Sequence, residues 1–449
     1  MATLGHNEMV PPVSQRLRRP PRPGADTKRL TRRDRRRRMS RSVDQSDGAC
    51  PLSGSATRAG RDKRPRMMLS SVPVVLQVLP SLVTGGVERG TVEITQAIAR
   101  AGWTALVASA GGPMVAQVER FGGRHVRLPL DTRNPLSVWR NVARLAALIR
   151  QENVSLVHAR SRAPAWSAWL ACQRTGTRFV TTYHGAYGED LPFKRHWNAV
   201  MARGEIVIAA SRYIADLVAD RHGVEWERIR VIARGVDPAI FDPAIVVPDR
   251  IMRLVRDWRL PDGATTVTLP GRLTSWKGQS VLLDAIARLD RPDVFCVLVG
   301  SDQGRHHYAN SLHTQALRLG IADRLRLVGQ CDDMPAALLL SDVVVHASTR
   351  PEAFGRVVIE AQAMGRPVVA ADSGGPVETV TDGETGWRVR PGDPDALAAA
   401  IGRALALTTE ERAALGQRAR ASVPTVRGMQ EATLRVYREI LGEREIPGE

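Results

Sequence analysis

The sequence has few of the residues on which several classes of protein depend. Its four cysteines are far apart in the chain, with no C-x-x-C pair and no His/Cys cluster at the spacing of zinc ligands. The strongest apolar run, Ala336 to Ala347, is interrupted by Ser341 and Asp342, so no segment approaches the roughly 18 residues that a membrane-spanning helix needs. These absences argue against a disulfide scaffold, a zinc module and an integral membrane protein. They favour a reducing cytoplasm as the compartment.

What the chain does have is length and apolar content. With 449 residues, of which 43% are hydrophobic, it can bury sizeable cores and has room for about three domains. Its net charge of +18 is unevenly spread, because residues 1–71 carry +12, residues 72–240 carry +8 and residues 241–449 carry −2. A basic composition suggests nucleic acid as a partner, but the near-neutral C-terminal half argues against that for the chain as a whole.

The first 66 residues are rich in Arg, Pro, Ser and Gly, and Arg35 to Arg38 form the densest basic run. Such a segment buries too little apolar surface to offset the entropy of an ordered chain, so we expect a disordered tail over residues 1–70. One interpretation is a polybasic arm for anionic lipid or nucleic acid. The favoured alternative is an extension without a specific role, upstream of a true start at Met67 or Met68, because the tail has no aromatic group for stacking on bases. Nucleic acid is therefore not an expected partner.

From Val72 onward, short β-branched runs alternate with helical periods, which is typical of βαβ units. Helices are predicted at residues 86–101 and 135–151, among others. Five or six strands are expected to form one doubly wound parallel sheet. The predicted strands are residues 74–79, 103–108, 124–128, 155–159, 178–183 and 205–210.

A passage rich in Pro and Asp, residues 237–262, interrupts this alternation, and a second series begins near Thr266. The predicted strands of that series are residues 266–269, 295–300, 324–328, 343–347, 367–371 and 387–389. The predicted helices are residues 278–289, 306–319, 334–340, 357–364, 394–407, 409–421 and 427–441. The fold class is therefore α/β, with two tandem Rossmann-like domains, residues 71–240 and 241–425, facing each other across a cleft. A C-terminal helix within residues 426–449 is expected to pack back on the first domain.

The loop Thr84-Gly85-Gly86 lies between the first predicted strand and helix. Adjacent glycines permit close approach of a ligand, and the helix that follows presents free N–H groups to an anion. Gly90 completes only G-G-x-x-x-G, and no acidic residue closes the second strand, so a nicotinamide enzyme is not supported. By itself the loop fits ligand contact and tight strand-to-helix packing equally well.

A second loop, Pro270 to Gly278, carries Arg272 and Lys277 five residues apart, just before a predicted helix. Both cations can converge near the helix N-terminus, which suits a diphosphate. The alternative is two solvated surface charges.

The segment Arg350 to Val369 carries two carboxylates. Pro351 favours an extended backbone, Gly355 allows a sharp turn, and Glu352 and Glu360 lie on the loop and on the helix that follows it. Each carboxylate can accept paired hydroxyl donors, one set from a sugar and one from a ribose. Because like charges near a phosphate site are costly unless they bind something, a purely structural role is the less favoured alternative.

With these motifs the chain resembles a retaining glycosyltransferase of family 4, the group 1 type, which has the GT-B fold. The resemblance covers about residues 72–441. The two glutamates match the E-x7-E element of the family, the Arg and Lys match its diphosphate clamp, and the adjacent glycines match its N-terminal glycine loop.

The resemblance implies roles for individual residues. Glu360 would hold the nucleotide ribose, and Glu352 would hold donor-sugar hydroxyls beside the backbone of Phe354 and Gly355. His184, which ends a first-domain strand, would contact the donor sugar near the reacting carbon, although a lone His is often only structural.

Four further residues are assigned with less specific motifs. His158 and Arg160 match a family position that faces donor or acceptor, and they are taken as acceptor-side residues. Gly300 and Gly329 end strands that would flank the nucleotide pocket and border the base. The catalytic set implied by the resemblance is His184, Arg272, Lys277 and Glu352.

Neither a metal ion nor a cofactor is expected beyond the nucleotide sugar itself as co-substrate. The one D-x-D motif, Asp393-Pro394-Asp395, is better explained as a helix cap with Pro at the first helical position. The family's front-side displacement, in which the leaving phosphate takes the acceptor's proton, needs no protein nucleophile.

The acceptor is suggested by the surface of the first domain. Residues 193–197, Phe-Lys-Arg-His-Trp, interleave cations with aromatic rings, which suits an anionic membrane surface, although an ordinary solvated face with Trp197 partly buried is equally compatible. The resemblance to envelope glycosyltransferases implies a glycolipid acceptor such as a lipopolysaccharide core, and mannose, glucose or an N-acetylhexosamine as the donor sugar. The enzyme would then be cytoplasmic and peripheral at the inner membrane.

Two other functions remain open at this point. A sugar-nucleotide epimerase can have the same two-domain architecture, and a nucleic-acid-binding protein could act through the basic tail. Intact clamp and carboxylate motifs favour the transferase over both.

Overall fold

The computed structural model describes residues 72–83, 85–132, 134–188 and 192–442, without the side chains of residues 192 and 193. The predicted tail, residues 1–70, and Thr84 of the glycine loop lie outside the described residues. Within the described ranges, none of the helices combines the length and the apolar content that crossing a bilayer requires.

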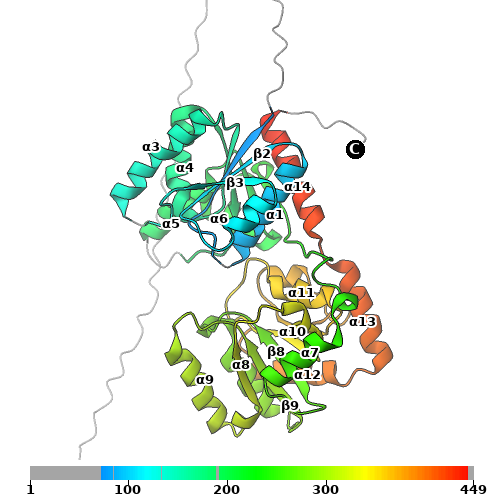
Figure 1. Ribbon diagram of the computed structural model, residues 1–449. Coiled ribbons are helices and arrows are strands. Elements are labelled where there is room, and N and C mark those ends of the chain that lie inside the picture. Colours follow the sequence, from blue (N-terminus) through cyan, green and yellow to red (C-terminus); the bar gives the residue numbers. More distant parts are fainter. Residues whose placement is uncertain (1–71, 84, 133, 189–191, 443–449) are drawn as a thin grey trace, which may run out of the picture. The chain divides into compact units, whose positions relative to one another are not determined.

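The first domain, coloured blue to green in Figure 1, is built on a parallel sheet whose described strands follow the order β3-β2-β1-β4-β5-β6-β7. The order reverses between β1 and β4, where doubly wound sheets leave room for a ligand at the carboxyl edge. The strands are β1 (Val74–Val78), β2 (Thr104–Ser109), β3 (Gly123–Arg127), β4 (Leu156–Ala159), β5 (Arg178–Tyr183), β6 (Ile206–Ala209) and β7 (Ile229–Val231). The prediction of five or six strands is therefore corrected to seven: β7 has only three residues, with Arg230 in the middle, and forms no recognisable apolar run.

Alternate residues of β1 show how the sheet is covered. Leu76 belongs to a core cluster with residues of the helices α3 and α4, whereas its neighbour Val75 belongs to a cluster with residues of α1 and the last helix, α14. Because successive side chains of a strand point to opposite faces, the two pairs of helices cover opposite faces of the sheet. The helices of this domain are α1 (Gly86–Arg100), α2 (Val115–Arg120), α3 (Pro135–Gln151), α4 (Arg162–Thr175), α5 (Pro192–Asn198) and α6 (Arg212–His222).

The second domain has a parallel sheet in the order β10-β9-β8-β11-β12-β13. Its strands are β8 (Thr265–Pro270), β9 (Val294–Val299), β10 (Leu325–Gly329), β11 (Val343–His346), β12 (Val368–Ala371) and β13 (Trp387–Val389). Its helices are α7 (Pro248–Asp257), α8 (Gln279–Arg288), α9 (His306–Arg318), α10 (Met334–Leu340), α11 (Arg356–Ala363), α12 (Pro394–Leu405) and α13 (Thr409–Ser422). Short 3-10 segments lie at Ala199–Ala202, Trp226–Arg228, Pro243–Ile245, Ser275–Lys277, Ala322–Arg324 and Gly375–Glu378.

Helix α7 lies within residues 237–262, the passage that was predicted to interrupt the alternation of strands and helices. Its first residue, Pro248, suits the start of a helix, and Leu254 together with the following Trp258 is buried in a core cluster that also contains residues of α10. The Pro and Asp residues of this passage therefore belong to a short helix and its flanking loops. The same passage also connects the two domains.

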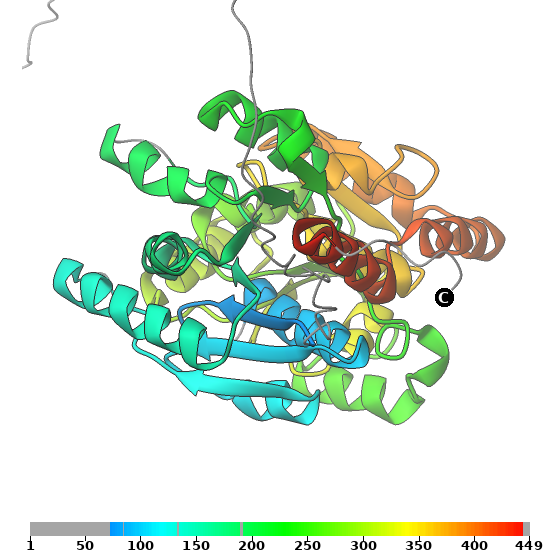
Figure 2. The same ribbon diagram turned by 90° about the horizontal axis from the view of Figure 1, so that it is seen from above.

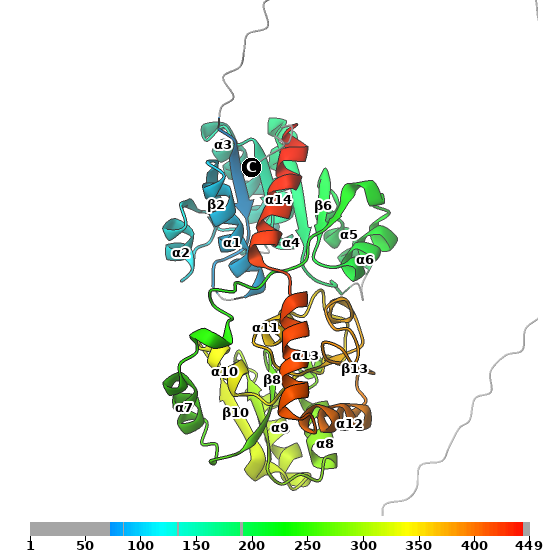
Figure 3. The same ribbon diagram turned by 90° about the vertical axis from the view of Figure 1, so that its right-hand side faces the viewer.

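The last helix, α14 (Val426–Leu441), packs on the first domain rather than on the second. Its residues Met429, Val436 and Tyr437 share a core cluster with β1 and α1. Figures 1, 2 and 3 all show α14 beside α1. The chain thus returns to its first domain after completing the second, and the backbone of Val236 pairs with Thr425 where the two passages meet.

Candidate functional site

The loop after β8 brings Lys277 to the carboxyl edge of the second sheet. Gly278, at φ 78°, separates the short 3-10 turn from α8, and a Cβ at this position would overlap the carbonyl oxygen of Ala347. Only glycine therefore lets this loop lie directly against the end of β11. The close approach places Lys277 beside Glu352 of the following loop.

Glu352 accepts three hydrogen bonds on a single oxygen. Its Oε1 lies 2.6 Å from Lys277 Nζ and 2.8 Å from His346 Nε2, and the Ser348 hydroxyl donates to the same atom. The side chains of the Lys and Glu are each 13% exposed, so the ion pair is largely enclosed. No described residue donates to Oε2, which leaves that oxygen available to hydroxyl donors of a ligand.

The electrostatics of this cluster keep Glu352 charged. Burial pushes the pKa of its carboxyl up, but the hydrogen bonds and charges of His346 and Lys277 hold the pKa well below the usual value of 4.5. Glu352 is therefore a carboxylate at neutral pH. Sequence reasoning missed His346 and Ser348; the only available signal was their position at the end of β11, directly before the carboxylate loop.

Glu360 lies in α11, the helix that directly follows the Glu352 loop, and is 6% exposed. Burial raises the pKa of its carboxyl, while Arg356 (Nε to Oε1, 3.4 Å) and Arg89 (Nη1 to Oε1, 3.6 Å) oppose that rise. Because Arg89 belongs to α1, this contact connects the carboxylate with the helix that follows the glycine loop. Arg356 also reaches Glu93 of α1, at 3.5 Å.

Arg272, the other half of the predicted clamp, is exposed, and none of the described residues forms an ion pair with it. Its backbone oxygen accepts a hydrogen bond from Gln279 of α8 at 2.9 Å, which fixes the loop near the helix start. The structure therefore encloses Lys277 and leaves the Arg272 guanidinium at the surface.

Four further residues were predicted to border the donor: Phe354, Gly355, Gly300 and Gly329. Phe354 is buried in a core cluster, and Gly355, at φ 78°, begins α11 in a left-handed conformation. A Cβ at Gly355 would lie 2.7 Å from Pro376 Cγ, so glycine is required there for space as well. Gly300 donates its N–H to the carbonyl oxygen of Gly329 at 2.7 Å, so these two strand ends lie side by side.

In the first domain, Arg234 connects the glycine loop with His184. This arginine follows β7, and its Nη2 donates to the carbonyl oxygen of Gly86 at 3.0 Å and to His184 Nδ1 at 3.2 Å. Gly85 caps α1 just before this contact. Arg234 belongs to no motif and follows a strand that is too short to be recognised, so its role is not evident from the sequence.

His184 is held neutral by its surroundings. Burial lowers the pKa of its imidazole well below 6.5, and the positive charges of Arg234 and Arg160 lower it further. Because Nδ1 accepts from Arg234, the ring proton resides on Nε2. That Nε2–H is enclosed and has no partner among the described residues, so it can donate to a ligand that reaches it.

His158 and Arg160, taken from the sequence as acceptor-side residues, are enclosed instead. His158 is fully buried, with Nδ1 2.6 Å from the Tyr437 hydroxyl and Nε2 2.6 Å from Thr182 Oγ1. Both ring nitrogens are therefore occupied, and in this conformation His158 joins β4 to α14 rather than facing an acceptor. Arg160 is 2% exposed and lies in the interior beside Arg234.

The D-x-D motif acts as a helix cap. The Asp393 side chain accepts from the backbone N–H groups of Asp395 and Ala396 at the start of α12. In the part of the chain that the structure describes, no group of three or more His, Cys, Asp or Glu residues is placed to hold a metal ion.

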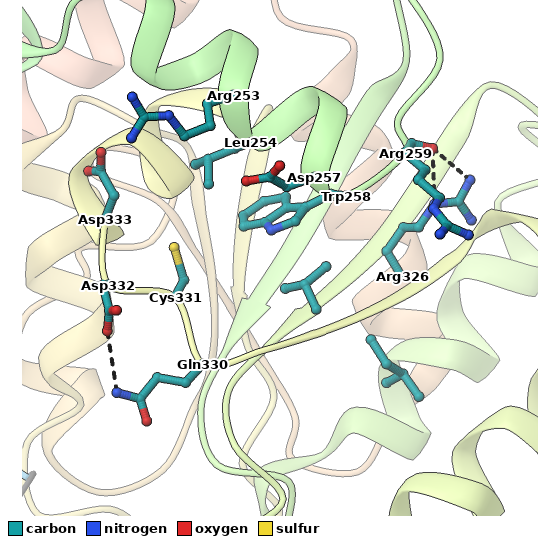
Figure 4. Close-up of a pocket in the computed structure, with 12 residues that line it drawn as sticks. Arg253, Leu254, Asp257, Trp258, Arg259, Arg326, Gln330, Cys331, Asp332 and Asp333 are labelled. Carbon is teal, nitrogen blue, oxygen red and sulfur yellow. Dashed lines mark hydrogen bonds between the residues drawn. The ribbon is translucent and has the colours of Figure 1, made fainter.

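A separate cavity of about 650 Å³ lies between α7 and the edge strand β10. Figure 4 shows Trp258 of the α7 side facing Cys331 and Gln330, which follow β10. Neither Lys277 nor Glu352 lines this cavity, so the enclosed ion pair and the cavity are different places on the domain.

Two family models match the chain. The model of glycosyl transferases group 1 matches residues 253–422, and the model of glycosyltransferase family 4 matches residues 84–240. The matched ranges contain the Glu352 cluster and the glycine loop, respectively.

Curated relatives carry related descriptions. The chain is 31% identical to a D-inositol 3-phosphate glycosyltransferase from Jonesia denitrificans over 276 residues, which cover 56% of this chain and 63% of that protein. It is also 31% identical to a GDP-mannose-dependent alpha-(1-6)-phosphatidylinositol monomannoside mannosyltransferase from Mycolicibacterium smegmatis over 303 residues, which cover 64% of this chain and 76% of that protein. The chain thus spans less than two thirds of the length of the first relative.

Two solved structures have a similar fold. A glycosyltransferase from Rickettsia africae has a TM-score of 0.77 and 33% identity, covering 83% of this chain and 100% of its own. Anabaena Alr3699/HepE in complex with UDP and glucose has a TM-score of 0.73 and 26% identity, covering 82% of this chain and 100% of its own.

Proposed function

The chain belongs to the group 1 glycosyltransferases of family 4 and has the GT-B fold, and on that premise we propose that it transfers a hexosyl group from a nucleotide-diphospho-sugar to a glycolipid of the cell envelope. We propose further that the transfer retains the anomeric configuration, uses no metal ion, and has a lipopolysaccharide core or another glycolipid as its acceptor.

The observation that carries this proposal is the hydrogen bonding of Glu352. A largely enclosed carboxylate with one oxygen occupied by Lys277, His346 and Ser348 is held in a single orientation, and its second oxygen has no donor among the described residues. Sugar hydroxyls are such donors. The related Anabaena protein was solved with UDP and glucose, which supports a nucleoside diphosphate sugar as the donor class.

The chemistry then follows from the charges. The bond between the anomeric carbon and the diphosphate oxygen breaks, and Lys277, the exposed Arg272 and the start of α8 stabilise the negative charge that develops on the diphosphate. The acceptor hydroxyl attacks from the same face and gives its proton to the leaving phosphate. The Nε2–H of His184 donates a hydrogen bond to the donor sugar, and Glu360 accepts the ribose hydroxyls.

A glycolipid acceptor is supported by an aromatic and basic surface on the first domain. Trp197 is 42% exposed on α5, Trp166 stacks on His196, and Arg203 lies 4.3 Å from the ring centre of Trp169. Indole rings and cations together favour an anionic lipid surface. The Mycolicibacterium relative is described as acting on a phosphatidylinositol mannoside, which is a lipid.

The transferase activity can be tested with a panel of nucleotide sugars. The donor that raises the melting temperature of the full chain most should also be consumed in the presence of a glycolipid acceptor. Glu352→Gln should lose at least about a hundredfold in turnover, because the neutral amide cannot replace the carboxylate. Glu410→Gln, an exposed position in the first turn of α13, is the matched control and should leave turnover unchanged. Wild-type turnover in Glu352→Gln would disprove the site assignment.

The membrane proposal has its own test. Co-sedimentation with liposomes should increase with anionic lipid, decrease with salt, and weaken when Lys194, Arg195 and Trp197 are replaced together. Liposome binding that does not change with anionic lipid content, with salt or with the triple replacement would favour a water-soluble acceptor.

A further inference from the structure

The interior of the first domain contains two arginines whose charges are not matched nearby. Arg160 follows β4 and is 2% exposed, and Arg234 follows β7 and is 8% exposed. A Cβ added at Gly90 of α1 would collide with Arg234 Nη1 and lie 2.8 Å from Arg160 Nη2. The two guanidinium groups therefore converge on one point behind the second turn of α1.

Several N–H groups of this pair lack an acceptor. Arg160 Nε and Nη2 are buried and have no hydrogen-bond partner, and Arg234 Nη1 has only the Met429 sulfur, at 3.8 Å. Among the described residues, no carboxylate lies within 4.0 Å of either guanidinium. The polar groups of the pair are thus strong donors in an enclosed place without the oxygen atoms that normally satisfy them.

The nearest negative charge does not resolve the imbalance. Glu93 of α1 acts on both arginines and Glu88 acts on Arg234, but neither carboxylate forms an ion pair with them, and Glu93 Oε1 lies 3.5 Å from Arg356 Nη2 instead. Burial lowers the pKa of Arg234 to about 9, and the positive charges of Arg160 and Arg356 contribute to that decrease. A buried charge without a partner is unfavourable, so a further negative charge at this place would stabilise the fold.

The space beside the pair limits what that charge can be. Arg160 and Arg234 line a small cavity with Thr182, Met429 and Thr433, between the sheet, α1 and α14. It has room for about one sphere the size of a water molecule. A phosphate or carboxylate group is too large for this space, and a chloride ion, which is somewhat larger than a water molecule, fits once the two guanidinium groups move apart slightly.

We propose that Arg160 and Arg234 bind a monoatomic anion of the size of chloride inside the first domain. The ion receives N–H donors from both guanidinium groups, and it joins the end of β4 to the end of β7 beneath α14. Because Arg234 also donates to Gly86 and His184, the ion indirectly holds the glycine loop and the imidazole in place. This site is independent of the identity of the sugar donor and of the acceptor.

Thermal unfolding of the full chain tests the proposal. At equal ionic strength and with the same cation, chloride and bromide should raise the melting temperature by about 2 °C relative to gluconate, which is too large to enter. Arg160→Met and Arg234→Met should abolish this difference. Arg178→Met, which removes an exposed arginine paired with Glu205, is the matched control and should keep it.

Crystals grown with bromide give a second measurement that does not depend on the variants being folded. We expect an anomalous peak within hydrogen-bond distance of Arg160 Nη2 and Arg234 Nη1. A water molecule at this point instead of bromide, identical melting temperatures of the wild-type chain in all three anions, or a chloride effect that persists in both arginine variants would each overturn the proposal.

Discussion

Two enclosed charged clusters, one in each domain, balance their charges in opposite ways. In the second domain, Glu352 is surrounded by Lys277, His346 and Ser348, which all donate to one oxygen. In the first domain, Arg160 and Arg234 lie together, and no carboxylate of the described residues is close enough to form an ion pair with them. The second-domain cluster is electrostatically complete within the protein, whereas the first-domain cluster needs a charge from elsewhere.

The difference shows what each cluster is suited to do. A complete cluster holds its groups in one geometry before a substrate arrives, which lowers the cost of reorganisation during a reaction. The geometry of an incomplete cluster changes when an ion binds in it. Because Arg234 donates a hydrogen bond to His184, such a change would also shift the imidazole. Substitutions in each cluster, a change of pH and removal of the tail each test this contrast.

The largest effect is expected when the complete cluster loses its cation. Lys277→Ala should reduce kcat/KM about a hundredfold, corresponding to ~3 kcal/mol of transition-state stabilisation, and should also lower the melting temperature because Glu352 stays buried without its partner. Arg272→Ala is the comparison variant: a similar loss of turnover is expected, but a melting temperature close to that of the wild type, since its side chain is exposed. Steady-state kinetics and calorimetry measure the two quantities. If Lys277→Ala melts like the wild type, the pair is not a structural part of the cluster.

A smaller effect is expected when the orientation of Glu352 is loosened while its charge partner stays. His346→Leu removes the Nε2–H donor, and the KM for the donor sugar should rise about tenfold with little change in kcat. His346→Gln keeps an N–H group and should recover most of the affinity. Equal KM values for the leucine and glutamine variants would mean that the imidazole only fills space.

The pH dependence of stability should differ between the clusters. His158 and His184 have pKa values well below 6.5 in the folded chain, so their contribution to stability is fully present above pH 6.5 and is lost as the pH falls through the folded values. The lowered pKa of Glu352 gives a contribution that is fully present above pH 4.5 and is lost as the pH falls from there towards the folded pKa. The melting temperature should therefore begin to fall below about pH 6.5, and His184→Asn should reduce the slope by a measurable amount. An unchanged slope in that variant would place the histidine in a solvated environment.

The smallest effect is expected from removal of the basic tail. The contrast between the clusters assumes that none of the six acidic residues within residues 1–71 supplies the charge that Arg160 and Arg234 lack. A chain that begins at Met68 should then keep the melting temperature within about a degree and keep its activity on a water-soluble acceptor. A decrease of several degrees would show that the tail packs on the first domain.

Regular elements of the fold were predictable because local patterns determine them. The spans of β5, β13, α3 and α10 follow from apolar periodicity and their flanking residues, and their predicted and observed bounds agree. Strand β7 and helix α7 were missed for local reasons as well, since one is too short and the other is flanked by residues that normally mark loops.

The second-domain residues were found because a contiguous motif carries them, whereas His346 belongs to no motif and became visible only through its contact with Glu352. The role of His158 could not be read from the chain, because its partner Tyr437 lies 279 residues away. Non-local contacts of this kind decide which polar residues are enclosed, and a sequence pattern does not encode them.

Helix α14 has a consequence for the order in which the protein can be made. The first domain lacks one of its core-forming helices until residue 441 has left the ribosome, because Met429, Val436 and Tyr437 fill the face of the sheet beside α1. Until then the growing chain carries an uncovered apolar surface, while the second domain can complete its own core earlier. The incomplete first domain therefore remains prone to aggregation for as long as the ribosome takes to synthesise the second domain. A pause of translation within residues 241–425 would lengthen this period.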